Sequence, residues 1–209
     1  MVEGIIGDFM NKELFDGRMH LVNEAVSIPK YEADVIRKRI DDHLQSRQTD
    51  KYRERGSGKM FTNNIISGIW GEFLARKFLI DNGFPPNIDV DLKIYGIGGK
   101  SYAADLIYSV IHPDLPDFQV KTNTIKHDDK FSWVLQVGDP LLTNPNDPTV
   151  MMFVTVPDGT LGMGIGKIVA IAPWKTVHSL PRAMVLDKFK NKQAIYLDDL
   201  RAMSKGTTS

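Results

Sequence analysis

The chain of 209 residues contains no cysteine. This absence excludes disulfide bonds, cysteine nucleophiles and zinc sites built from thiolates, and it fits a reducing compartment. The sequence also lacks any apolar run approaching 18 residues, and its first segment carries Glu3 and Asp8. Neither a membrane span nor a signal peptide is therefore expected. These absences together predict a cytoplasmic protein that does not enter a membrane.

An excess of one charge is missing as well. The 26 Lys and Arg residues balance the 26 Asp and Glu residues, so the formal net charge is zero. A strongly basic chain would indicate nucleic acid directly, whereas here the argument depends on local charge. One stretch is locally basic, with the cations Arg47, Lys51, Arg53, Arg55 and Lys59. Such a run either contacts phosphates or forms a solvated helix face and linker, and the sequence leaves both interpretations open.

The remaining composition is that of an ordinary soluble protein. Hydrophobic residues make up 42% of the chain and charged residues 25%, which fits a globular domain with an appended element. We expect an N-terminal helical and basic extension at residues 1–60 and a core at 61–209. Apolar residues at helical spacing predict helices at 31–46 and 63–81. Gly83 then lies where a left-handed C-terminal cap is wanted.

Strands follow the second helix. Apolar and polar residues alternate from Ile88 to Ile94, as in a half-buried strand. Further strands are predicted at 102–108, 117–122, 132–137, 150–156, 162–172 and 194–197, with short helices at 173–180 and 198–203. The run at 150–156 is apolar throughout, which is typical of a strand covered on both faces. This order of elements predicts an α/β or α+β fold with a mixed sheet.

The most informative residues lie on two of these strands. Asp105 stands in one apolar run, and Gln119-Val120-Lys121 stands fourteen residues later in a second run. If the two runs pair as neighbours, Asp105 lies beside Gln119, and the period of two puts Gln119 and Lys121 on one face. The Asp105 carboxylate, the Gln119 amide oxygen and the Val120 carbonyl are hard donors that suit Mg²⁺, with Mn²⁺ as an alternative. A lysine beside them can hold an attacking water or stabilise charge on a phosphate.

These residues resemble the PD-(D/E)xK nuclease superfamily, the fold of many restriction endonucleases, phage nucleases and junction resolvases. The resemblance covers roughly residues 63–135. It rests on Gly71-Glu72 in a helix, Ala104-Asp105, and Gln119-Val120-Lys121, in this chain order. Two positions depart from the motif, because Ala104 replaces its proline and Gln119 replaces its second acid. Some members, such as Mrr-like restriction enzymes and certain transposase nuclease subunits, also have glutamine there.

The resemblance implies an α/β, restriction endonuclease-like core with a central mixed sheet flanked by helices. It implies a metal-dependent DNA endonuclease of a bacterial or phage-infected cell. Asp105, Gln119 and the Val120 carbonyl would hold the metal. Lys121 would orient the attacking hydroxide, and Glu72 would support the metal or its water. Cutting both strands of a duplex commonly needs two sites, so a homodimer is expected.

Two other functions fit the same residues. A noncatalytic nucleic-acid-binding or assembly subunit could keep the fold with a degraded site, because Gln119 replaces an acid. A purely structural protein could use Asp105 and Lys121 as an ion pair. Glu72 has a second interpretation too, as a surface carboxylate paired with Arg76 at i+4.

Two Pro-Asp pairs compete with Asp105 as the acid of the motif. The pairs are Pro113-Asp114 and Pro116-Asp117. Asp117 would lie on the same strand as Gln119, so no second strand would cross the site, and Asp114 lies in a turn signal. Asp105 is preferred because it stands inside an apolar run.

Overall fold

The computed structural model describes residues 16–48, 59–92, 104–108, 115–125, 132–160, 162–184 and 192–206. The helices in these ranges are α1 Lys30–Gln48, α2 Lys59–Asp81, α3 Trp174–Val177, α4 Leu197–Gly206 and the 3₁₀ helix η4 Pro140–Thr143. The strands are β1 His20–Ser27, β2 Ile88–Val90, β3 Leu106–Tyr108, β4 Phe118–Ile125, β5 Ser132–Gln136, β6 Val150–Pro157, β7 Ile165–Pro173, β8 Arg182–Ala183 and β9 Lys192–Tyr196.

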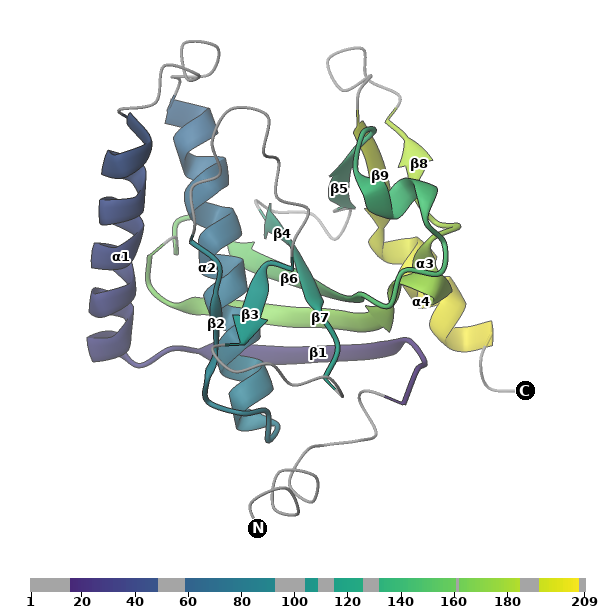
Figure 1. Ribbon diagram of the computed structural model, residues 1–209, viewed down its shortest axis with the longest axis horizontal. Coiled ribbons are helices and arrows are strands. Elements are labelled where there is room, and N and C mark those ends of the chain that lie inside the picture. Colours follow the sequence, from purple (N-terminus) through teal and green to yellow (C-terminus); the bar gives the residue numbers. More distant parts are fainter. Residues whose placement is uncertain are drawn as a thin grey trace.

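Six of these strands form the central sheet, in the order β1-β7-β6-β4-β3-β2 (Figure 1). Strands β4 and β6 run parallel, and every other neighbouring pair is antiparallel. The expected mixed sheet is therefore confirmed, with helices on its flanks. The remaining three strands make a separate sheet in the order β5-β9-β8, called the small sheet below.

Helix α2 covers one face of the central sheet. Its side chains, among them Trp70 and Phe73, are buried against apolar residues of β4, β6 and β7. The helix ends as predicted at a left-handed cap, where Gly83 has a φ of 88°. In the middle of the helix, a Cβ on Gly71 would lie 1.8 Å from Thr122 Oγ1. Glycine at this position therefore lets the helix backbone pack directly on the Thr122 side chain of β4.

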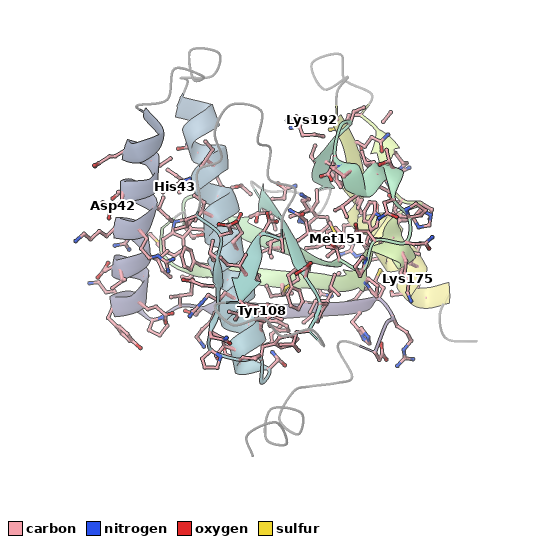
Figure 2. All side chains as sticks on the ribbon, in the orientation of Figure 1. Asp42, His43, Tyr108, Met151, Lys175 and Lys192 are labelled. Carbon is pink, nitrogen blue, oxygen red and sulfur yellow. The ribbon has the colours of Figure 1, made fainter. Side chains whose placement is uncertain are left out.

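The other face of the central sheet is covered by the small sheet with α3 and α4 (Figure 1). Along β6, Met152 and Val154 belong to the core under α2, whereas Met151 and Phe153 belong to the second core. Figure 2 labels Met151 on the side of the small sheet. Both cores bury this strand, so the prediction of a strand covered on both faces is confirmed.

Strand β1 is an edge strand that the sequence pattern does not predict. It pairs antiparallel with β7, and the register shifts between Leu21 and Glu24, where Asn23 has a φ of 52°. This bulge interrupts the alternation that would mark a strand. Helix α1 follows and buries Ile36 and Ile40 in the core that it shares with α2. The N-terminal stretch assigned to an extension thus contributes strand β1 to the central sheet and helix α1 to the core beside α2.

Candidate metal and phosphate site

Asp105 lies where β3 and β4 separate. Leu106 pairs with Phe118, and the Asp105 N–H donates to the Phe118 carbonyl at 2.9 Å. At the next equivalent position of β4, the Val120 N–H donates to Asp105 Oδ2 at 2.7 Å instead of to a strand backbone. Gln119 Nε2 donates to the same oxygen at 2.5 Å. Asp105 and Gln119 thus lie side by side as expected, and we call the group of Asp105, Gln119, Val120 and Lys121 the Asp105 fork.

The side chains of β4 alternate between the two cores. Val120 is buried in the core under α2, and Thr122 faces Gly71 of that helix. Gln119 and Lys121 therefore point to the opposite face, towards the small sheet. Asn123 confirms this direction, because its Nδ2 donates to the Ser132 carbonyl of β5 at 2.5 Å.

Burial raises the pKa of the Asp105 carboxyl above its ordinary value. The charge of Lys121 and the hydrogen bonds from Val120 and Gln119 act in the opposite direction, and Asp139 adds to the increase. Because desolvation prevails, ionising this carboxyl in the folded chain costs free energy. Its Oδ1 accepts no hydrogen bond from the described residues. A bound cation at Oδ1 would offset the cost of the buried charge.

The donor atoms of the fork fit a hard divalent cation in part. Asp105 Oδ1 is available, and the Val120 carbonyl faces the same edge of β4 as its N–H, which reaches Asp105. The Gln119 amide, however, directs its nitrogen to Asp105, so a half-turn about its last bond would be needed to present the oxygen. Within the described ranges, no cluster of three or more His, Asp or Glu side chains could hold a metal ion.

Glu72 lies on α2, the helix that covers the face of β4 opposite to Gln119 and Lys121. It follows Gly71, which touches Thr122, whereas Gln119 and Lys121 occupy the other face of that strand. Glu72 is half-buried. Its role as a metal carboxylate stays a prediction.

Arg76, the surface partner considered for Glu72, contacts other residues. It lies 3.7 Å from Glu32 and 3.5 Å from Asp89, and its Nε donates to the Ile88 carbonyl at 2.8 Å. These partners join α2 to α1 and β2. They leave the i+4 pairing of Glu72 and Arg76 without support.

Asp139 reaches the fork from the segment between the predicted strands at 132–137 and 150–156. Its Oδ1 accepts from the Leu141 N–H at 3.1 Å at the start of η4, and its Oδ2 lies 3.9 Å from Lys121 Nζ. The two side chains are only 17% (Lys121) and 13% (Asp139) exposed. The Asp-Pro pair at 139–140 is a recognisable helix-start signal. The sequence does not link it to Lys121, because that contact depends on how the small sheet folds over β4.

The expected phosphate-binding residues fall largely outside the described ranges. Lys51, Arg53 and Arg55 lie in the segment 49–58, which the structure does not describe. Arg47 belongs to the last turn of α1 and Lys59 to the first turn of α2, and their side chains are not described either. Their contact with nucleic acid stays a prediction.

Comparison of the chain with protein-family models and with curated proteins finds no match. The likeness to PD-(D/E)xK nucleases therefore rests on the residues of the Asp105 fork and on the helix, strand, strand order around them. In the described ranges, no helix is both long and apolar enough to span a membrane.

Proposed function

We propose that this chain is a Mg²⁺-dependent DNA endonuclease with a restriction endonuclease-like core, acting as a homodimer. The observation that supports it most is the arrangement at the Asp105 fork. A desolvated carboxylate there has one oxygen without a hydrogen bond from the described residues, and Gln119 and Lys121 lie next to it on one face. Such a site attracts a hard cation and can place a phosphate against an ammonium group.

Each residue has a distinct part in the proposed hydrolysis. Asp105 Oδ1, the Val120 carbonyl and, after rotation, the Gln119 amide oxygen would hold Mg²⁺, which would supply Lewis-acid polarisation of the phosphate and activation of water. Lys121 orients the attacking hydroxide and stabilises charge on the phosphate. For Glu72 to support the same water, its side chain must reach from the α2 side of β4 past the strand edge to the Lys121 face. The attacking water gives up one proton to solvent, and its oxygen bonds to phosphorus as the bond from phosphorus to the sugar oxygen breaks. The leaving sugar oxygen takes up a proton from solvent water.

The purely structural alternative has less support. Among the described residues Lys121 ion-pairs with Asp139, and no ion pair joins it to Asp105. Burial raises the pKa of Asp105 although the charge of Lys121 acts in the opposite direction. The charge of Lys121 attracts Asp105 but does not compensate its desolvation.

A noncatalytic nucleic-acid-binding or assembly subunit is the second candidate, and one observation favours it. The Gln119 amide donates to Asp105 Oδ2 and so satisfies part of the carboxylate without any metal. In such a protein the residues of the fork would hydrogen-bond to one another and would bind no metal. Binding without cleavage would then be the expected behaviour.

Cleavage of supercoiled plasmid separates the two candidates. We expect the wild-type chain to cut with Mg²⁺ or Mn²⁺ and to stop in EDTA. Asp105→Ala should abolish cutting, and Lys121→Ala should slow it about 10²–10⁴-fold, the usual effect of a positioned charge or proton-transfer group. Lys175→Ala is the matched control, because Lys175 is exposed on α3 (Figure 2) and should cut like wild type. Metal-independent DNA binding with no cleavage by the wild type would support the noncatalytic subunit instead.

A further inference from the structure

Two contacts hold β5 across the Lys121 face of β4. At the start of β5, the Ser132 carbonyl accepts from Asn123 Nδ2 at 2.5 Å. Beyond its end, the Asp139 N–H donates to the Gln136 carbonyl at 2.9 Å, and the Asp139 side chain reaches Lys121. Buried Trp133 fixes the strand between them, because its Nε1 donates to the Val154 carbonyl of β6 at 2.9 Å. The position of Asp139 is therefore set by the core and not by a free loop.

The carboxylate of Asp139 is oriented as well as placed. Its Oδ1 accepts the Leu141 N–H at the start of η4, which turns Oδ2 towards Lys121 Nζ. The 3.9 Å between Oδ2 and Nζ is too long for a hydrogen bond. The ammonium is thus attracted to Asp139 without being bound tightly, and it keeps donors for a phosphate.

Asp139 also acts electrostatically on Asp105, on which Lys121 acts with the opposite sign. The ammonium of Lys121 is therefore influenced by two carboxylates. With Asp105 alone, it would be drawn onto the oxygen that the proposed metal needs. Gln119 carries no charge, so it cannot provide the second attraction.

We propose that Asp139 is a positioning residue for Lys121. Its carboxylate holds the ammonium on the small-sheet side of the fork, away from Asp105. It is the second carboxylate that acts on Lys121, a part that uncharged Gln119 cannot play. This inference rests on the proposed nuclease function. It adds a residue from the segment after β5 to a site otherwise built on β3 and β4.

The test uses variants of the full chain and steady-state plasmid cleavage with Mg²⁺. Asp139→Asn is the informative change, because asparagine caps η4 as well as aspartate does while removing the charge. We expect kcat to fall about 10–100-fold, as for residues that orient a catalytic group, with KM for DNA unchanged. Asp139→Glu should recover part of the loss. Asp147→Asn is the matched control. Asp147 lies in the same connection between β5 and β6, accepts hydrogen bonds from the N–H and hydroxyl of Thr149, and makes no ion pair with a described lysine.

A double-mutant cycle decides whether Asp139 acts through Lys121. If it does, Asp139→Asn should slow Lys121→Ala no further, because the group that it positions is already gone. Additive losses, or a wild type that cleaves while Asp139→Asn behaves like Asp147→Asn, would overturn this inference and leave the nuclease function standing. A wild type that cleaves no DNA with either metal overturns the proposed function, and this inference with it.

Discussion

Replacing Asp105 by asparagine should make the metal-free protein more stable at neutral pH. Asparagine keeps the shape of the side chain and an oxygen that can accept the Val120 N–H. It removes a charge whose desolvation outweighs the attraction of Lys121, which is why the pKa of Asp105 is raised. A gain of 1 kcal/mol moves Tm by about 2–4 °C in a chain of this length. We therefore expect a higher Tm for Asp105→Asn than for wild type.

The pH dependence has a definite sign. Well below the ordinary value of 3.8, Asp105 is protonated in both folded and unfolded chains, so it costs nothing. As the pH rises above 3.8, the unfolded chain loses its proton first, and the folded chain loses stability until the pH passes the raised pKa. The Tm advantage of Asp105→Asn should consequently shrink as the pH is lowered towards 3.8.

Divalent metal should make the Tm of wild type higher than that of Asp105→Asn. A ligand at 100 times its Kd stabilises the folded state by about 2.7 kcal/mol, which corresponds to about 5–11 °C here. The Tm of wild type should rise by this amount in Mg²⁺ or Mn²⁺, and the Tm of Asp105→Asn should not. Differential scanning calorimetry with EDTA and with metal measures both effects. A lower Tm for Asp105→Asn in EDTA, with no effect of metal on the Tm of wild type, would contradict this prediction. Asp105 would then have a structural role instead of a metal-binding one.

Two further predictions concern α2 and the amide of the fork. Gly71→Ala should destabilise the chain by about 1–3 kcal/mol by overpacking, because the new Cβ would lie 1.8 Å from Thr122 Oγ1. Gly68→Ala in the same helix has nothing within 4 Å and should stabilise it by up to about 1 kcal/mol; equal effects in denaturant melts would show that the close contact is wrong. Gln119→Glu should preserve cleavage and tighten Mn²⁺ binding measured by calorimetry, because it adds a charge at a ligand position. Gln119→Leu should abolish cleavage, and an active leucine variant would remove this residue from the metal site.

Local periodicity was enough to predict much of the fold. Helix α1 spans Lys30–Gln48 where 31–46 is predicted, and β6 is buried on both faces as its apolar run implies. Strand β1 escapes prediction because its bulge at Asn23 breaks the alternation. The small sheet escapes it for another reason. The alternation along β5 marks a strand but does not encode that its neighbour is β9 instead of β4.

At the candidate site, too, the local sequence pattern predicts some contacts, and others depend on how distant segments pack. The spacing of Asp105 and Gln119 on consecutive strands predicted that they lie side by side, because a short connection usually joins neighbours. Asp139 was not predictable, because its approach to Lys121 is set by the packing of Trp133 and its neighbours between the sheets. The direction of the Gln119 amide is likewise a product of the folded fork, since the sequence says only that an amide is present.

An anomalous difference map from a crystal of the wild-type chain soaked in Mn²⁺ shows whether the Asp105 fork binds a metal ion. We expect a peak at the Asp105 fork, within about 2.5 Å of Asp105 Oδ1 and of the Val120 carbonyl oxygen. We also expect that the Gln119 amide turns its oxygen to the ion and that the peak is absent from Asp105→Asn. A fork without a peak at saturating Mn²⁺, with Gln119 Nε2 still donating to Asp105, would contradict these expectations.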